Sequence, residues 1–108
     1  MQRGDLYRVR RPPGDPKPAR TFVVVGSQAV IDSRFATVIC APVFSQSHGL
    51  PTEVDIGVAE GLKHASAIQC DSLVSIGKSR LTDFVGTPGS AKSQQLSYAL
   101  AVALALRL

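Results

Sequence analysis

Short apolar runs, several of which alternate with polar residues, occupy most of the first 86 positions of the chain. Alternation is typical of a strand with one buried face, and a β-branched run is typical of a central strand. Segments of these two kinds lie at 5–10, 20–26, 36–44, 52–56, 64–76 and 83–86. About six short strands at this spacing predict a small β-barrel or a compact sheet.

Polar and proline-containing segments separate these runs, and the periodicity changes near the C-terminus. The stretch "RPPGDPKPA" predicts a surface loop over 12–19, and "SQAVIDSR" at 27–34 predicts a turn. After "TPGS" the repeat becomes 3.6 residues, which predicts a C-terminal helix over 90–106 with Ser90 as its N-cap. Its apolar stripe consists of Leu96, Ala99, Leu100, Ala103 and Leu104. The expected fold is mainly β with short helices, a small barrel closed by this helix.

Length and composition limit the class of protein. The chain has 108 residues, so we expect a single domain over 1–108, and its 44% apolar and 19% charged residues exclude disordered and fibrous classes. We find no secretory signal and no stretch long enough to span a bilayer, so we expect a cytoplasmic protein without a membrane partner. Cys40 and Cys70 have neither metal-ligand nor disulfide-framework spacing, which predicts two packed, reduced thiols in strands, no metal site and no cofactor.

Positive charge is concentrated in the N-terminal third of the chain. The formal net charge is +4, and residues 1–34 hold seven basic side chains against three acidic ones. The remaining residues hold five of each sign. Such clustering favours a polyanionic partner, either RNA, DNA or an acidic protein segment. The alternative is a solvated face that serves only solubility.

Five segments occur in a fixed order before the C-terminal helix. They are "RGDLY", "RTFVVVG" with its opening arginine, "ATVICAPVFS", "GLKHASAIQCDSL" and "IGKSRLTDFVG". In this order they resemble the MazF/PemK family, the toxin halves of type II toxin-antitoxin modules, from Arg3 almost to the end of the chain. The resemblance implies an SH3-like barrel, a homodimer, an acidic antitoxin partner and metal-independent cleavage of single-stranded mRNA that inhibits translation and growth.

The resemblance also implies catalytic residues. Attack by a ribose 2′-hydroxyl on its neighbouring phosphate needs a base, an acid and donors that stabilise the phosphoryl oxygens. Arg20 stands at the family's catalytic arginine, and its guanidinium stays charged and can donate twice to one phosphate. Asp71 stands at a proposed general base, although a strand-end aspartate that caps a turn is the alternative. Gln69 occupies the place of an acid arginine, so the leaving oxygen would take its proton from Arg20 or His48.

The segment "APVFSQSH" at 41–48 departs from the family pattern. Phe44 occupies the position of a threonine whose hydroxyl contacts the scissile phosphate, and a phenyl ring offers no such hydrogen bond. Ser45 is one replacement for that hydroxyl, and His48 is a source of acid-base capacity. A weakened site that binds RNA without cutting it is the third interpretation. Phe44 itself is either a platform on which a base stacks or a ring of the core.

Basic residues near this site are expected to bind the RNA backbone. The expected RNA-binding residues are Arg8, Arg10, Arg11, Lys17, Phe44 and Lys78. For Arg80 we favour a structural role, holding a turn through a backbone carbonyl or lining a dimer. His64 has no metal-spaced partner, so we favour a surface histidine.

Two other functional classes stay open at this point. The same barrel occurs in toxins that resemble CcdB, which bind DNA gyrase and cut nothing, and Phe44 and Gln69 would be harmless there. A general RNA- or DNA-binding SH3-like domain is the other alternative. The loop at 11–19 is shorter than the family's loop, so the sequence preference of a relative does not transfer to this chain.

Overall fold

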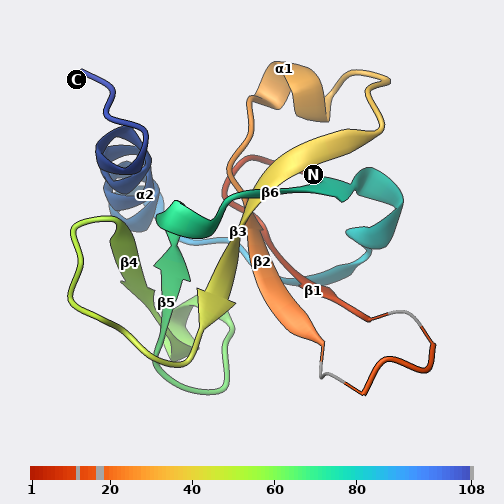
Figure 1. The fold of residues 1–108 in the computed structure, drawn as a ribbon, viewed down its shortest axis with the longest axis horizontal. Helices are drawn as coiled ribbons and strands as arrows, with labels where there is room; N and C mark the ends of the chain where they lie inside the picture. The colour runs from red at the N-terminus through yellow and green to blue at the C-terminus, as the bar shows by residue number, and fades with distance from the viewer. Residues whose placement is uncertain (12, 17–18, 108) are drawn as a thin grey trace.

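A computed structural model describes residues 1–11, 13–16 and 19–107 of the chain. These residues form one curled antiparallel sheet with a long C-terminal helix and several short helices (Figure 1). The strands are β1 Leu6–Val9, β2 Arg20–Val24, β3 Thr37–Phe44, β4 Glu53–Ile56, β5 Ser66–Gln69, β6 Val74–Gly77 and β7 Asp83–Gly86. The helices are α1 Gln28–Ile31 and α2 Ser90–Ala103, with single 3₁₀ turns η1 Val58–Glu60, η2 Cys70–Ser72 and η3 Lys78–Arg80.

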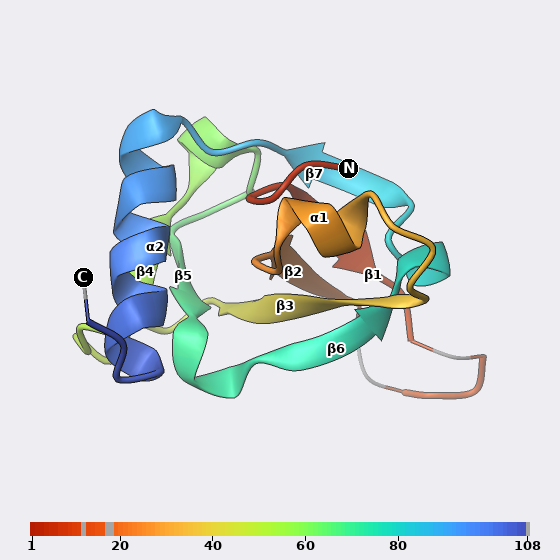
Figure 2. The same cartoon turned by 90° about the horizontal axis from the view of Figure 1, so that it is seen from above.

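The long strand β3 organises the sheet. The strands follow the order β4-β5-β3-β2-β1-β7, and β6 also pairs with β3. Thr37 to Cys40 of β3 pair with β6, whereas Val43 and Phe44 pair with β5 (Figure 2). Since one strand is shared between two neighbours in this way, the sheet bends into a half-barrel. The predicted mainly-β fold with a C-terminal helix is confirmed, and the segment at 64–76 contributes two strands.

Alternation along the strands divides the buried side chains between two clusters. In β2, Val23 faces the cluster that α2 covers, and Val24 faces the cluster on the other side of the sheet. The first cluster includes Leu6, Ile68 and Leu96. The second cluster is built from Tyr7, Val9, Val24, Ile31, Val38, Cys40, Ile76 and Leu81. Neighbouring residues at a strand end are therefore expected to face opposite sides of the sheet.

The helix α2 ends three residues before the predicted position 106. Leu96, Ala99 and Leu100 are buried as predicted, but Leu104 is 54% exposed. The chain leaves the helix at Ala105, whose φ is +56°, while the Leu106 amide donates to the Ala101 carbonyl at 2.8 Å. This is a Schellman ending, in which alanine takes the left-handed position usually held by glycine. Because no glycine stands at this position, the sequence gives no signal for the end of the helix, and the apolar repeat continues beyond it.

Two further expectations need correction. The N-cap of α2 is Gly89, and Ser90 is the first helical residue. The segment at 27–34 is more than a turn, because α1 forms one helical turn with Ser27 as its N-cap. Lys78 fastens the end of that turn, since its Nζ donates to the carbonyl oxygens of Val30 at 2.7 Å and Ser33 at 2.8 Å.

Two glycines allow the segment around η1 to lie directly against β7. A Cβ on Gly61 would come 2.6 Å from the Val85 carbonyl oxygen, and one on Gly86 would come well within 3.0 Å of the Glu60 carbonyl oxygen. Gly61 also has a φ of +98°, a conformation that favours glycine. The backbone contact therefore depends on the lack of side chains at both positions.

None of the helices formed by the described residues is both long enough and apolar enough to cross a membrane.

Candidate active site

Arg20 and Phe44 are brought together by the pairing of β2 with β3. Phe22 lies opposite Pro42 in this antiparallel pair, so the first residue of β2 falls beside the last residue of β3. The Arg20 Cζ lies 4.2 Å from the centroid of the Phe44 ring, which is the geometry of a cation–π contact. Both side chains are half-buried. The ring of Phe44 therefore supports the guanidinium predicted to be catalytic.

Arg20 also lines a hollow of about 190 Å³, which we call the Arg20 hollow. Its lining residues are Val9, Arg11, Arg20, Phe22, Val74, Ser75, Ile76 and Arg80. Among the described residues, three guanidinium groups and no carboxylate line this hollow, which suits a phosphate. Arg80 donates to the Arg10 carbonyl oxygen at 3.3 Å, which confirms the predicted contact of Arg80 with a backbone carbonyl.

Ser45 lies in a different hollow from Arg20. This second hollow, which we call the Ser45 hollow, measures about 330 Å³. It is lined by Arg8, Thr21, Val43, Ser45, Gly61, Leu62, Lys63, His64, Ser66 and Val85. Thr21 follows Arg20 and Ser45 follows Phe44, so each adjacent pair divides between the two sides of the sheet.

Glu53 organises the loop that follows Ser45. Its carboxylate accepts the backbone N–H of His48 at 3.0 Å and that of Leu50 at 2.7 Å. It also accepts a short hydrogen bond from the side-chain amide of Gln69, which is buried. These backbone hydrogen bonds, chiefly from Leu50 and then His48, lower the pKa of Glu53. Gln69, noted for replacing an acid arginine, therefore helps to hold this loop.

Replacing Glu53 with glutamine should loosen the loop at 48–50. A group with a lowered pKa stabilises the folded loop above its unfolded pKa, here 4.5, and this contribution disappears as the pH falls through the folded-state value. The protection factors of the His48 and Leu50 amides, measured by hydrogen exchange relative to the intrinsic rate at each pH, should therefore fall in acid in the wild type, and should be low already at neutral pH in Glu53→Gln. Asp55→Asn, on the same strand but exposed, is the matched control. Equal protection of both amides in Glu53→Gln and wild type would contradict this role.

Asp71 and His48 are held by two adjacent residues. Asp71, exposed in η2, accepts a short hydrogen bond from the Thr52 hydroxyl, and Glu53 binds the His48 backbone. The Asp71 side chain and the His48 backbone are thus attached to the start of β4. Phe44, by contrast, pairs with Ala67, whereas Asp71 lies beyond the other end of β5. Arg20 and Phe44 are therefore in direct contact, whereas the second pair of candidates, Asp71 and His48, is held separately by Thr52 and Glu53.

The remaining basic candidates lie in several places. Arg11 lines the Arg20 hollow and Arg8 lines the Ser45 hollow, while Arg8 and Arg10 share a third hollow with Asp83. Lys78 binds the carbonyls that end α1, as described above. Lys17 lies outside the described residues.

The cysteines are buried and free. Burial raises the pKa of Cys40 to about 12, and burial together with the charge of Asp71 raises that of Cys70 to about 11. Both thiols are therefore protonated at neutral pH. Cys40 lies in β3 as expected, but Cys70 opens η2. No three His, Cys, Asp or Glu side chains gather into a possible metal site in the part of the chain that the structure describes.

The sequence missed the Ser45 hollow and the role of Glu53. Alternation at the ends of two paired strands is the signal that predicts opposite faces for Phe44 and Ser45. The contacts of Glu53 with His48 and Leu50 span only three to five residues, whereas its contact with Gln69 depends on the pairing of β4 with β5 (Figure 1).

Comparisons with known proteins point to one family. The family model described as "PemK-like, MazF-like toxin of type II toxin-antitoxin system" matches residues 2–104. A solved structure titled "Endoribonuclease in complex with its cognate antitoxin from Mycobacterial species" is 26% identical, with a TM-score of 0.84 over 100% of this chain and 98% of that one. No curated protein sequence matches the chain.

Two further solved structures are similar. "Endoribonuclease from Mycobacterial species" is 25% identical, with a TM-score of 0.81 over 100% of this chain and 94% of that one. "Mycobacterium tuberculosis toxin MazF-mt6" shares the fold at 22% identity and a TM-score of 0.82, over 96% of this chain and 99% of that one. The fold and the family model together define a toxin of the MazF type. The chain belongs to the PemK-like, MazF-like toxin family of type II toxin-antitoxin systems.

Proposed function

We propose that this chain is an endoribonuclease that cleaves single-stranded mRNA and so inhibits translation and growth. The observation that carries the proposal is the Arg20 guanidinium, stacked on Phe44 in a hollow lined by three arginines. Membership of the toxin family and the similarity to solved endoribonucleases support it.

Arg20 would stabilise the phosphate undergoing attack. When the 2′-hydroxyl of a ribose adds to the neighbouring phosphate, negative charge builds on the phosphoryl oxygens, and a fixed guanidinium lowers the energy of that state. The contact with Phe44 limits the movement of the guanidinium before RNA arrives, so less reorganisation is needed during the reaction. The role of the Phe44 ring would be to hold the Arg20 guanidinium in position. The ring does not supply the hydrogen bond that the family's threonine hydroxyl makes to the phosphate.

Proton transfer is assigned to the second pair of candidates. Asp71, oriented by Thr52, would accept the 2′-hydroxyl proton, and the His48 imidazole would donate a proton to the departing 5′-oxygen. For this, the 2′-hydroxyl and the 5′-oxygen beside the phosphate held at Arg20 would have to come within hydrogen-bond reach of Asp71 and His48. The exposed positions of His48 and Asp71 allow a substrate strand to approach.

Control by an antitoxin is part of the proposal. The similar structure with a bound antitoxin supports a protein partner, and an acidic segment would complement the arginines of the Arg20 hollow. In this function the protein would act as a homodimer in the cytoplasm.

Incubation of the purified protein with a long single-stranded RNA, with EDTA present, tests the function. We expect specific fragments with 2′,3′-cyclic phosphate ends and 5′-hydroxyl ends, because 2′-hydroxyl attack expels the 5′-oxygen. Sequencing of the 5′ ends and chemical analysis of both termini give the measurement. Fragments with 5′-phosphate ends would contradict the 2′-hydroxyl mechanism. Intact RNA, with loss of DNA supercoiling by gyrase, would support a CcdB-like function instead.

A further inference from the structure

The Ser45 hollow has the chemistry of a nucleotide site. Arg8, Lys63 and His64 bring basic nitrogen donors to its wall, and Thr21, Ser45 and Ser66 bring hydroxyl groups. Apolar side chains complete it, namely Val43, Leu62 and Val85. In the part of the chain that the structure describes, no carboxylate lines this hollow; Asp83, the cross-strand partner of Arg8, lines the third hollow, which Arg8 also lines. Basic and hydroxyl groups beside an apolar wall suit a phosphate joined to a base.

The wall of this hollow is fixed before any ligand binds. Lys63 and His64 follow η1, whose backbone lies against β7 at Gly61 and Gly86 with no room for a Cβ. The Glu60 carboxylate accepts the Gly57 amide at 2.7 Å, and the Leu62 amide donates to the Gly57 carbonyl at 3.2 Å. Hydrogen bonds and backbone contacts therefore hold this segment on both sides of η1. Such a segment offers a site that is already formed before a ligand binds, unlike a flexible basic loop.

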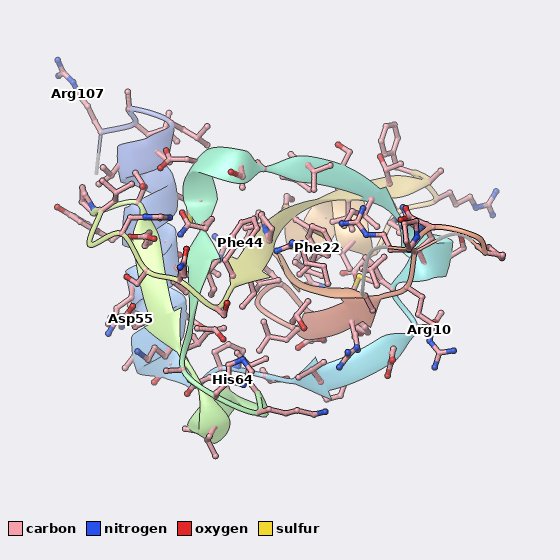
Figure 3. The ribbon with its side chains drawn as sticks, turned by 60° about the horizontal axis from the view of Figure 1, so that its bottom comes forward. Arg10, Phe22, Phe44, Asp55, His64 and Arg107 are labelled. Carbon is pink, nitrogen blue, oxygen red and sulfur yellow. The ribbon has the colours of Figure 1, made fainter. Side chains whose placement is uncertain are left out.

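Two residues of the Ser45 hollow are also direct sequence neighbours of the two residues at the predicted reaction site. Ser45 and Thr21 are the immediate neighbours of Phe44 and Arg20, and they face the other side of the same two strands. His64 lies below Phe44 in the view of Figure 3, on the segment that follows η1. An RNA strand that crosses the end of the β2–β3 pair would therefore meet both hollows.

We propose that the Ser45 hollow binds one nucleotide of the RNA strand, next to the nucleotide whose phosphate lies at Arg20. Arg8 and Lys63 hold the phosphate of this nucleotide, the hydroxyl groups and His64 complete its hydrogen bonds, and its base lies against Leu62 and Val85. The inference rests on the proposed function for its substrate, but the site itself is testable without any RNA cleavage.

Binding of adenosine 5′-monophosphate, followed by NMR of backbone amides, tests the site directly. We expect saturable shifts at Ser45, Lys63 and His64 at about millimolar nucleotide, weaker shifts with inorganic phosphate, and little with adenosine. Arg8→Ala and Lys63→Ala should each weaken binding about tenfold. Arg107→Ala, which removes an exposed arginine far from this hollow, should bind as the wild type does (Figure 3). Lys63 lies in a loop, so its variant is readable even if Arg8→Ala does not fold.

Steady-state kinetics of RNA cleavage then distinguish nucleotide binding in the Ser45 hollow from the chemical step. We expect Lys63→Ala to raise KM for RNA about tenfold with kcat unchanged, because the nucleotide bound here is not the reacting one. Nucleotide shifts confined to the Arg20 hollow, or none at all, would overturn the inference even if the protein cuts RNA. If wild-type protein binds the nucleotide in the Ser45 hollow but leaves RNA intact, the site stands and the proposed function fails.

Discussion

Replacing Arg20 with alanine should lower the rate of RNA cleavage by about 100- to 1,000-fold. The guanidinium is the group best placed to stabilise charge on the attacked phosphate, because it is held over the Phe44 ring in a hollow whose described lining residues include no carboxylate. The loss should appear in kcat, since the charge that Arg20 opposes develops mainly in the transition state. Single-turnover cleavage of a short RNA with saturating enzyme measures this step.

Two further variants test whether the loss is specific to Arg20 and whether it depends on the contact with Phe44. Arg107→Ala removes an equal charge far from the site and should leave the rate unchanged (Figure 3). Phe44→Leu keeps the guanidinium but removes its support, so we expect a loss of about tenfold or less. If Arg20→Ala cleaves as fast as wild type, Arg20 is not catalytic. If Phe44→Leu is as fast as wild type, the ring does not position Arg20.

Replacing Gly86 with alanine should destabilise the fold by about 3 kcal/mol. The added Cβ would collide with the Glu60 carbonyl, and backbone cannot move aside as a flexible side chain can. For a domain of this size we expect the melting temperature to fall by more than about 10 °C. Thermal unfolding followed by circular dichroism gives the measurement.

Gly77→Ala is the matched control for this prediction. Gly77 also ends a strand, but the nearest atom to an added Cβ is the Ser79 hydroxyl oxygen at 3.9 Å. Its stability should change by less than about 0.5 kcal/mol. Equal melting temperatures of Gly86→Ala and wild type would show that η1 and β7 are free to separate.

The sequence predicted individual residues of the candidate site but not how these residues are arranged in space. The basic cluster and the family resemblance singled out Arg20, and the same resemblance singled out Phe44 as a departure. Neither indicated that the guanidinium lies on the ring, because that contact depends on how two strands separated by 12 residues pair in space. The separation of Ser45 from Arg20 is another result of that pairing.

Local patterns in the sequence determined which segments become strands and that the chain ends in a helix. Alternation and the 3.6-residue repeat suffice for this, because burial of one face is the dominant local requirement. The sharing of β3 between β5 and β6, and the contact between Glu53 and Gln69, were decided only by the tertiary structure. These features depend on long-range packing, whose energy is absent from any short window of sequence. The same packing decides which residues share a hollow, and therefore which can act on one RNA strand.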